Sequence, residues 1–268
     1  MFSTLEAAAE ALLLTTCKIL RESNVEFVIV GGWSPFLRKS NSSIVHPGTR
    51  DVDVLFKDKD IKMLQEGIKN MLADGFMASA KHEFQMLRPI NVDSQEFIFN
   101  VDFLHPSEQR AKPELLSDIF DLGVPDASDP SGKRWVKSIV FQPAQIVFER
   151  KLFSPITLNG SSVTGEVLHE CIPLLNEAGL VLSKLNSVKQ EKRPRDSFDI
   201  FYILSGENGR EATNTITSLK NSIEEIDDQL TSFKNWLLKK AHVFDDNVNR
   251  YLKARHDSPS TLVKEALN

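Results

Sequence analysis

The chain has 268 residues, a net charge of −5, 41% hydrophobic residues and 26% charged residues. These values are typical of a globular protein with one large core or two smaller cores, and they exclude a fibrous, low-complexity or broadly basic chain that coats nucleic acid. The two cysteines, Cys17 and Cys171, have no Cys-x-x-Cys spacing, which excludes a disulfide framework and a four-thiolate zinc site and predicts two buried free thiols in a reducing compartment.

The N-terminal segment carries alanine and leucine triplets that look superficially like a signal peptide. However, Glu6 and Glu10 are acidic where a signal peptide requires basic residues, and Glu10 interrupts the apolar run. The apolar residues fall instead on one helical face: Leu5, Ala9, Leu12, Leu13, Ile19 and Leu20. No window reaches the roughly 18 apolar residues of a membrane span, so we expect an amphipathic first helix and a cytoplasmic protein with no membrane partner.

Strand and helix patterns alternate over the next part of the chain. Residues 25–30 are β-branched and apolar and end at Gly31-Gly32, which predicts a buried strand stopped by a glycine turn. Ser34-Pro35 predicts an N-cap followed by proline in the first helical turn. Further elements are predicted as a loop at 39–49, strands at 52–56, 84–90, 96–104 and 135–141, helices at 61–72 and 143–152, a long connection at 105–131, and a hairpin turn at Asn159-Gly160.

From about residue 166 the pattern becomes helical. Apolar residues recur at spacings of three and four at Ile216, Leu219, Ile223, Ile226, Leu230, Phe233 and Leu237. This pattern is typical either of helices that pack on their own domain or of a dimer seam, so the oligomeric state stays open. The sequence therefore predicts an α/β domain with a mixed sheet over residues 1–165, followed by a helical C-terminal domain over residues 166–268.

Two aspartates lie on one predicted strand, and a third lies on another. Side chains at positions i and i+2 of a strand project the same way about 7 Å apart, so Asp51 and Asp53 can share a divalent cation. Asp102 lies in another apolar strand that could run alongside the first. Mg²⁺ or Mn²⁺ prefers such oxygen ligands, typically one or two carboxylates together with substrate phosphates. A second Asp-x-Asp at 58–60 follows a strand end and opens a helix, which predicts capping instead.

The Gly31-Gly32 turn adds a second element to the candidate site. A strand, a tight glycine turn and a helix N-terminus together present backbone N–H groups that can bind phosphates. A lone Gly-Gly is a common turn, and its weight here comes from the order strand, glycines, helix, loop and acid-x-acid strand. Trp33 beside the turn could stack on a base or pack in the core.

These residues resemble a known family. Gly31-Gly32-Trp33-Ser34, followed by the segment 49–55 (Thr-Arg-Asp-Val-Asp-Val-Leu), is similar to the signature of DNA-polymerase-β-like minimal nucleotidyltransferases, and most similar to the AbiEii-type toxin nucleotidyltransferases. The resemblance implies a nucleotidyltransferase fold, a nucleoside triphosphate (NTP) substrate, and Mg²⁺ bound by Asp51, Asp53 and Asp102. It places Gly31, Gly32, Ser34 and Arg50 at the nucleotide. Pro47 stands where the family often has arginine, and Gly32 where some members use serine, which leaves Ser34 as the substitute.

A second match covers Leu182–Leu185 and Arg193–Ile200, so the resemblance extends over residues 25–105 and 180–204. It resembles the family's C-terminal element, in which a helix lysine precedes basic residues and Asp-x-x-Asp. The resemblance implies that Lys184 meets the nucleotide phosphates and that Arg195, Asp196 and Asp199 support the site.

The residues themselves leave alternatives for this segment. Five cations lie within twelve residues, and they could form a phosphate- or RNA-contacting patch or a solvated helix end: Lys184, Lys189, Lys192, Arg193 and Arg195. Asp196 and Asp199 could act as an N-cap and as salt-bridge partners of Arg193 or Arg195 instead of taking part in chemistry.

Other motifs narrow the chemistry. His46, His82, His105 and His169 are scattered without metal-ligand spacing and are expected to be structural or surface groups. The sequence contains no Gly-x-Ser-x-Gly, no Walker-type lysine loop and no His-Glu-x-x-His, which argues against serine-hydrolase, P-loop and zincin chemistry.

The expected function is therefore a Mg²⁺-dependent transfer of a nucleoside monophosphate from an NTP to an acceptor hydroxyl. The resemblance implies an acceptor in RNA, such as a tRNA end, or in a protein, and a toxin–antitoxin setting with an antitoxin partner. The alternatives are a catalytically inactive binding module of the same fold, a small-molecule (antibiotic) nucleotidyltransferase, and a carboxylate–metal phosphohydrolase or nuclease.

Overall fold

The computed structural model describes residues 2–57, 61–105, 119–125, 135–141 and 144–268. The chain divides into two compact units. The first, here called the sheet unit, comprises Met1–Trp33 and Gly48–Leu174, and the second, here called the helical unit, comprises Ser34–Pro47 and Leu175–Asn268.

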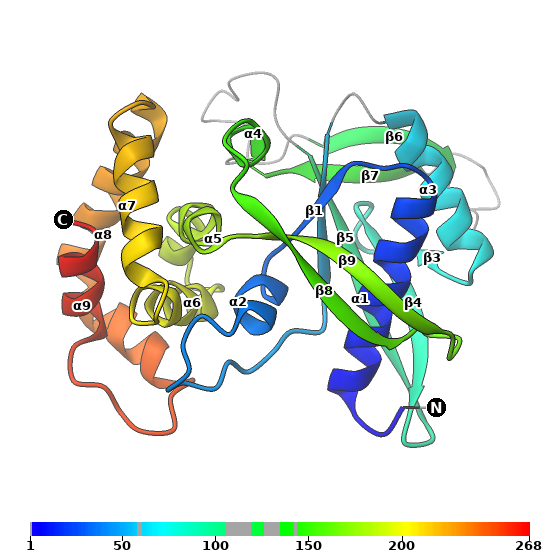
Figure 1. Cartoon of the computed structure of the whole chain (residues 1–268), viewed down its shortest axis with the longest axis horizontal. Helices are drawn as coiled ribbons and strands as arrows, with labels where there is room; N and C mark the ends of the chain where they lie inside the picture. Colours follow the sequence, from blue (N-terminus) through cyan, green and yellow to red (C-terminus); the bar gives the residue numbers. More distant parts are fainter. Residues whose placement is uncertain (1, 58–60, 106–118, 126–134, 142–143) are drawn as a thin grey trace. The chain divides into compact units, whose positions relative to one another are not determined.

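The sheet unit is built on one mixed sheet (Figure 1). Its elements are α1 (Leu5–Glu22), β1 (Phe27–Val30), β2 (Val52–Phe56), α3 (Ile61–Ala73), β3 (Met77–Ala78), β4 (Gln85–Val92), β5 (Gln95–His105), β6 (Ile119–Pro125), β7 (Trp135–Val140), α4 (Ala144–Glu149), β8 (Phe153–Ser161) and β9 (Val167–Leu175). In the described residues the strands follow the order β3-β4-β5-β2-β1-β9-β8, and β7 pairs with both β5 and β6. β2 is parallel to β5 and antiparallel to β1, while β1 is parallel to β9. The predicted mixed α/β fold class is confirmed.

Helix α1 forms because its sequence is apolar over a wide face and capped at its start. The Thr4 hydroxyl accepts a hydrogen bond from the backbone N–H of Ala7 at 3.1 Å, which satisfies one of the free donors of the first turn. The helix packs against β4, β5 and β8, and α3 lies beside it (Figure 1). None of the helices in the described part of the chain has the length and hydropathy needed to cross a lipid bilayer.

The predicted hairpin turn at Asn159-Gly160 is wrong, because both residues lie inside β8. The chain reverses at residues 162–166, where the N–H of Gly165 (φ +90°) donates to the Ser162 carbonyl at 3.0 Å. Gly160 instead permits a close approach by helix α1. A Cβ atom at Gly160 would lie 2.7 Å from Leu14 Cδ1, so a larger residue would require the buried Leu14 side chain to move.

The helical pattern also starts later than predicted, because residues 167–175 form β9. Burial alternates along this strand, but Glu170 occupies a buried position and hides the strand pattern in the sequence. Its carboxylate accepts two hydrogen bonds from Arg21, at 3.0 and 2.9 Å, which satisfies the buried charge. The same alternation exposes Cys171, so the prediction of two buried thiols is correct for Cys17 and wrong for Cys171.

Two further predictions need adjustment. The connection predicted at 105–131 contains strand β6, which has a register shift between Asp121 and Val124 against β7. The Asp-x-Asp at 58–60 lies outside the described residues. The other predicted strands and helices of this unit are confirmed within a few residues of their expected ends.

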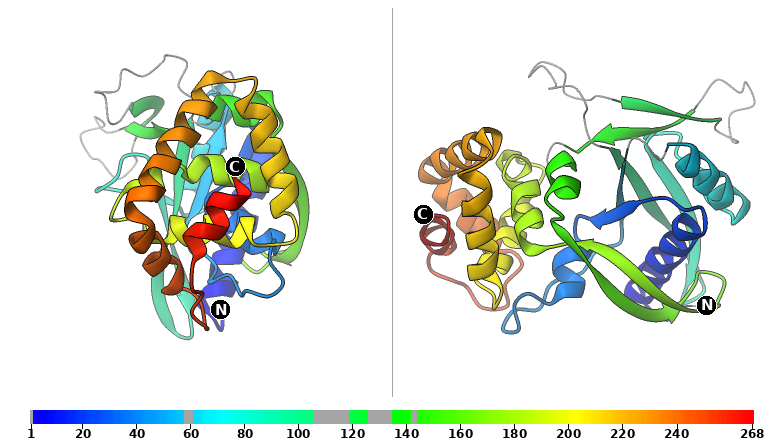
Figure 2. Two further views of the ribbon diagram at one scale, coloured as in Figure 1. Left: turned by 90° about the vertical axis from the view of Figure 1, so that its left-hand side faces the viewer. Right: turned by 45° about the horizontal axis from the view of Figure 1, so that its top comes forward.

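The helical unit contains α2 (Trp33–Arg38), α5 (Glu177–Lys184), the short 3₁₀ turn η2 (Ser187–Lys189), α6 (Pro194–Leu204), α7 (Gly209–Lys220), α8 (Glu224–Asn249) and α9 (Pro259–Ala266). Helix α6 contacts α5, α7, α8 and α9, and Figure 2 shows α8 (orange) and α9 (red) from two further directions. The apolar residues predicted as a seam lie on α7 and α8, with Ile223 as the N-cap residue between them, and those on the two helices are buried within the chain. Of the two alternatives, packing of these helices on their own domain is confirmed, and the dimer seam is not.

The segment 34–47 is joined to α6 and the turn after it by backbone and side-chain contacts. The N–H of Glu207 donates to the Ser40 carbonyl at 3.1 Å, and a Cβ atom at Gly206 would lie only 1.7 Å from that same oxygen. Asn41 Nδ2 donates to Ser205 Oγ at 2.9 Å, and the Tyr202 hydroxyl donates to the Asn41 carbonyl at 3.3 Å. These contacts explain why a segment that lies between two strands of the sheet unit belongs to the helical unit.

Candidate functional site

The register of the sheet places Asp53 directly beside Asp102. β2 and β5 run parallel, and the two aspartates are paired across them. Paired residues on strands about 4.8 Å apart project from the same face, so the two carboxylates are neighbours. Gln85 on β4 is paired with Asp102 from the other side, which completes a row of three polar side chains across three strands.

This row lies at the boundary between a buried part and a solvent-exposed part of one face of the sheet. Asp53 and Asp102 are both partly exposed. Two residues further along each strand, on the same face, the paired residues Leu55 and Leu104 are buried. Two neighbouring carboxylates at this boundary repel each other, and a bound cation would relieve that repulsion.

Two amides orient the carboxylate of Asp102. Gln85 Nε2 donates to Asp102 Oδ1 at 2.8 Å, and Asn100 Nδ2 donates to the same oxygen at 2.9 Å. Both contacts fall on one oxygen, which leaves Oδ2 as the atom with which Asp102 can meet a ligand. Sequence reasoning missed both amides, although a polar residue two positions before an acid on an apolar strand was a usable signal for Asn100.

The glycine turn lies against the other carboxylate. Gly31 has a φ of +69°, and a Cβ atom built on it would lie 2.0 Å from Asp53 Oδ2 and 3.0 Å from Asp53 Cγ. Only glycine permits both the left-handed backbone and this approach of the carboxylate. The structure therefore brings together one predicted phosphate-binding glycine and one predicted metal ligand.

Replacing Gly31 by alanine is expected to destabilise the protein by about 1–2 kcal/mol, because alanine disfavours a positive φ, and to weaken Mn²⁺ binding roughly tenfold, because the methyl group displaces the Asp53 carboxylate. Urea unfolding and isothermal titration with Mn²⁺ measure the two effects. Gly165→Ala is the matched control, since Gly165 also has a positive φ (+90°) but has open space around the added Cβ. Equal metal binding by both variants would contradict the role given to Gly31.

The remaining predicted residues of this unit lie around the row. Arg50 and Asp51 are exposed and come immediately before β2, so Asp51 is outside the strand on which the sequence placed it. Gly32 is partly exposed in the turn between β1 and α2. Among the described residues, no group of three or more His, Cys, Asp or Glu side chains is arranged to hold a metal ion. Asp53 and Asp102 alone fit a magnesium ion, because this ion commonly binds one or two carboxylates and takes its other ligands from water and phosphates.

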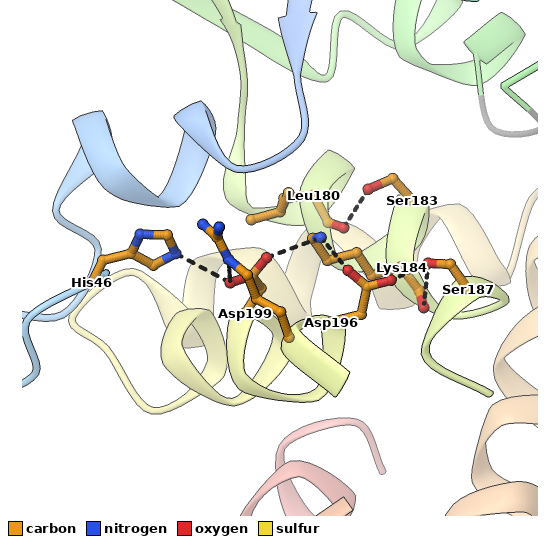
Figure 3. Close-up of polar contacts among 8 residues, drawn as sticks. His46, Leu180, Ser183, Lys184, Ser187, Asp196 and Asp199 are labelled. Carbon is orange, nitrogen blue, oxygen red and sulfur yellow. Dashed lines mark hydrogen bonds and ion pairs between the residues drawn. The ribbon is translucent and has the colours of Figure 1, made fainter. Parts of the chain in front are cut away.

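The helical unit contains a separate charged cluster around Lys184, which ends α5 (Figure 3). Lys184 Nζ lies 2.6 Å from Asp196 Oδ1 and 2.9 Å from Asp199 Oδ2, two acids one turn apart on α6. Ser187 Oγ donates to Asp196 Oδ2 at 2.6 Å. All three charged side chains are buried, so each charge depends on the others for compensation.

The pKa values in this cluster follow from that compensation. Burial alone would lower the pKa of Lys184, but the charges of Asp199 and Asp196 outweigh it and raise the pKa well above its ordinary value. Burial alone would raise the pKa of Asp199, but Lys184 and a hydrogen bond from His46 hold this pKa well below its ordinary value. The ammonium group and the carboxylate therefore both stay charged around neutral pH.

His46 completes the cluster from the loop at 39–49. Its Nε2 lies 3.1 Å from Asp199 Oδ1, and its ring packs edge-on to Tyr202 at 5.2 Å between centroids. Burial lowers the pKa of His46, more than the contact with Asp199 raises it, so the neutral ring donates its Nε2 proton to the carboxylate. The expected structural role of this histidine is confirmed, although no sequence pattern indicated its partner Asp199.

These contacts bear on the roles that the sequence predicted for Lys184, Asp196 and Asp199. The amine of Lys184 is enclosed by two carboxylates, which argues against the phosphate contact expected from the resemblance and favours a role in joining α5 to α6. The N-cap role for Asp196 and Asp199 is wrong, because the cap residue of α6 is Arg193. The salt-bridge role is correct for Asp199, which lies 3.6 Å from Arg195 Nε.

Ser34 and Trp33 are part of the interior. Helix α2 begins at Trp33, so Ser34 is not an N-cap, and its hydroxyl donates to the Leu175 carbonyl at 2.5 Å. Ser34 is fully buried, which leaves it unsuited to contact a phosphate. Trp33 is also buried, which confirms core packing over base stacking.

No family model and no curated protein matches the chain. Among solved structures, the chain is similar to the antibiotic-resistance factor ANT(2'')-Ia, with a TM-score of 0.35 and 13% sequence identity over 88% of this chain and 97% of that one. A TM-score this low carries no inference about function.

Proposed function

We propose that the protein is a metal-dependent nucleotidyltransferase whose active site is the acid row formed by Asp53 and Asp102, with the exposed Asp51 joining them as a ligand once a cation and a nucleotide are bound. The observation that supports this proposal most is the pairing of Asp53 with Asp102 on parallel neighbouring strands, beside a left-handed glycine turn. Two adjacent carboxylates at the open end of a sheet face supply hard oxygen ligands, and the glycine turn lies directly against the carboxylate of Asp53.

In the proposed reaction, a hydroxyl oxygen of the acceptor attacks the α-phosphorus of an NTP. A new P–O bond forms to the acceptor, the bond between the α-phosphorus and the bridging oxygen breaks, and pyrophosphate leaves. Mg²⁺ or Mn²⁺, when bound, neutralises the triphosphate and stabilises the charge that develops on the attacking and leaving oxygens.

The protein residues position these groups. Asp53 and Asp51 hold the charge that balances the cation, and Gly31 and Gly32 present backbone to the phosphates without side-chain obstruction. Asp102, fixed by Gln85 and Asn100, is oriented to accept the proton of the acceptor hydroxyl through Oδ2. The two amides act through Asp102 and are therefore positioning residues.

The acceptor is the finer part of the proposal. The resemblance to AbiEii-type toxins supports an RNA acceptor, such as a tRNA end, or a protein hydroxyl, together with an antitoxin that neutralises the activity. A small-molecule acceptor such as an antibiotic is the alternative within the same chemistry, because one fold serves many acceptors.

A labelling assay tests the proposal. The purified full chain is incubated with each α-³²P-labelled NTP and Mg²⁺ or Mn²⁺, in the presence of total tRNA, a cell-protein extract, or an aminoglycoside. Label on one acceptor, release of pyrophosphate and loss of both in EDTA are the expected results. Labelled free monophosphate without a labelled acceptor would indicate a phosphohydrolase, and the absence of any metal-dependent nucleotide binding in titration calorimetry would indicate an inactive binding module.

A further inference from the structure

The helical unit contains a hollow of about 250 Å³ that is separate from the charged cluster around Lys184. One wall comes from residues 188–191, at the end of η2, and the other from α8. The α8 residues Trp236, Lys240, Val243 and Asn247 line this second wall on both sides of a kink in the helix, where Lys240 has a non-helical backbone (φ −127°, ψ 28°). The hydroxyl of Ser232 on α8 lies 2.8 Å from Lys189 Nζ and ties the two walls together.

Trp236 gives this hollow an aromatic surface that is held in place. Its ring is stacked on Phe233 at 6.2 Å between centroids and meets Phe244 edge-on at 6.5 Å. Phe233 and Phe244 are fully buried, so they fix the indole from the core side while Trp236 itself stays partly exposed. A rigid, partly exposed indole is suited to stack on a planar ligand.

The charge of the hollow is positive in a protein whose net charge is −5. Three cations line it, namely Lys189, Lys240 and Arg250, against one acid, Glu191. In the part of the chain that the structure describes, none of the three cations lies within ion-pair distance of a carboxylate. Among the described residues, Lys189 Nζ donates to the neutral oxygens of Asn186 and Ser232. The positive charge is therefore available to an anionic ligand.

We propose that this hollow binds a nucleotide unit, with the base stacked on Trp236 and the phosphate facing Lys189, Lys240 and Arg250. The combination of one aromatic wall and several cations matches a planar base joined to a phosphate, and the volume suits one such unit. The unit could belong to a free nucleotide or to single-stranded RNA, which share this chemistry. This site is independent of the acid row, because it contains no pair of carboxylates and needs no metal ion.

Binding measurements on the full chain in EDTA test this site apart from the acid row. Anisotropy of a labelled single-stranded RNA nonamer reports on RNA, and isothermal titration calorimetry with AMP reports on a free nucleotide. Trp236→Ala is expected to weaken binding roughly tenfold or more through loss of stacking, and Lys240→Gln combined with Arg250→Gln is expected to weaken it and to flatten its salt dependence. Lys239→Gln, an exposed neighbour that does not line the hollow, is the control and should bind like the wild type.

The two probes separate the sources of the ligand. Binding of AMP with the same sensitivity to these variants supports a free nucleotide, and binding of the RNA alone supports a strand. The double variant Lys240→Gln, Arg250→Gln changes two exposed positions, so it still tests the site if Trp236→Ala fails to fold. Unchanged binding in both variants, or equal competition by inorganic phosphate with no effect of Trp236→Ala, would overturn the proposal.

Discussion

Replacing Asp53 by asparagine is expected to reduce nucleotidyl transfer by about a thousandfold while the protein stays folded. The asparagine keeps the size of the side chain but removes one of the carboxylate charges that would hold the cation, and a bound cation contributes several kcal/mol to transition-state stabilisation. At about 1.4 kcal/mol per factor of ten, a loss of about 4 kcal/mol corresponds to this reduction. The measurement is the rate of label transfer under saturating NTP.

Stability measurements separate this effect from misfolding. Asparagine keeps the shape of aspartate, so Asp53→Asn and Asp102→Asn are expected to stay folded and to unfold at a temperature close to that of the wild type. Glu96→Gln changes an exposed acid at the far end of β5 and should leave transfer unchanged. Gln85→Ala should reduce transfer roughly tenfold, because Asp102 loses one of its orienting amides. Wild-type rates in Asp53→Asn would refute the assignment of the acid row.

Replacing Lys184 by methionine is expected to destabilise the protein by about 3–5 kcal/mol. Methionine keeps the length of the side chain but leaves two buried carboxylates, Asp196 and Asp199, without their shared cation. Burying an uncompensated charge costs more than the pair contributes when it is intact. Urea unfolding at neutral pH measures the change, and Lys192→Met, at an exposed position in the same segment, should stay within about 0.5 kcal/mol of the wild type.

The shifted pKa values of Asp199 and Lys184 determine how the stability deficit of Lys184→Met changes with pH. The pKa of Asp199 is lowered from its ordinary 3.8, so its stabilising contribution is present above that value and is lost as the pH falls through the lower folded-state pKa. The pKa of Lys184 is raised from its ordinary 10.5, so its contribution is present below that value and is lost as the pH rises through the higher folded-state pKa. The deficit of Lys184→Met should therefore be largest near neutral pH and shrink in acid, where Asp199 becomes protonated. A deficit that is constant from neutral pH into strong acid would contradict the charged pair.

The local patterns of the sequence predicted most of the sheet unit. The strand 52–56 and the glycine turn after residue 30 were readable because each depends on neighbouring residues: alternating apolar positions in one case and a backbone with positive φ in the other. β9 was missed because a buried charge, Glu170, broke the apolar pattern and only its distant partner Arg21 explains that charge. The hairpin signal at Asn159-Gly160 failed because Gly160 serves packing against α1 instead of a turn.

In the candidate site too, local patterns predicted some features, and contacts between distant residues could not be predicted. The sequence predicted that Asp53 and Asp102 would lie on adjacent strands, and the register pairs them. Their proposed metal role is still a prediction, as is that of Asp51. The partners of Lys184 were predicted by resemblance to support a nucleotide, but the structure shows them neutralising the lysine. His46 could not be connected to Asp199 from the sequence, because 153 positions separate them and no local pattern specifies such a contact.

The path of the chain between the two units has a practical consequence for the design of truncated fragments. The backbone passes from one unit to the other after Trp33, after Pro47 and after Leu174. A fragment that starts at residue 175 therefore lacks the strand-to-strand insert that supplies His46, and it would leave Asp199 without that hydrogen-bond donor. The C-terminal helices should be produced either within the intact polypeptide or as a fusion that restores residues 34–47, because simple truncation removes part of their own core.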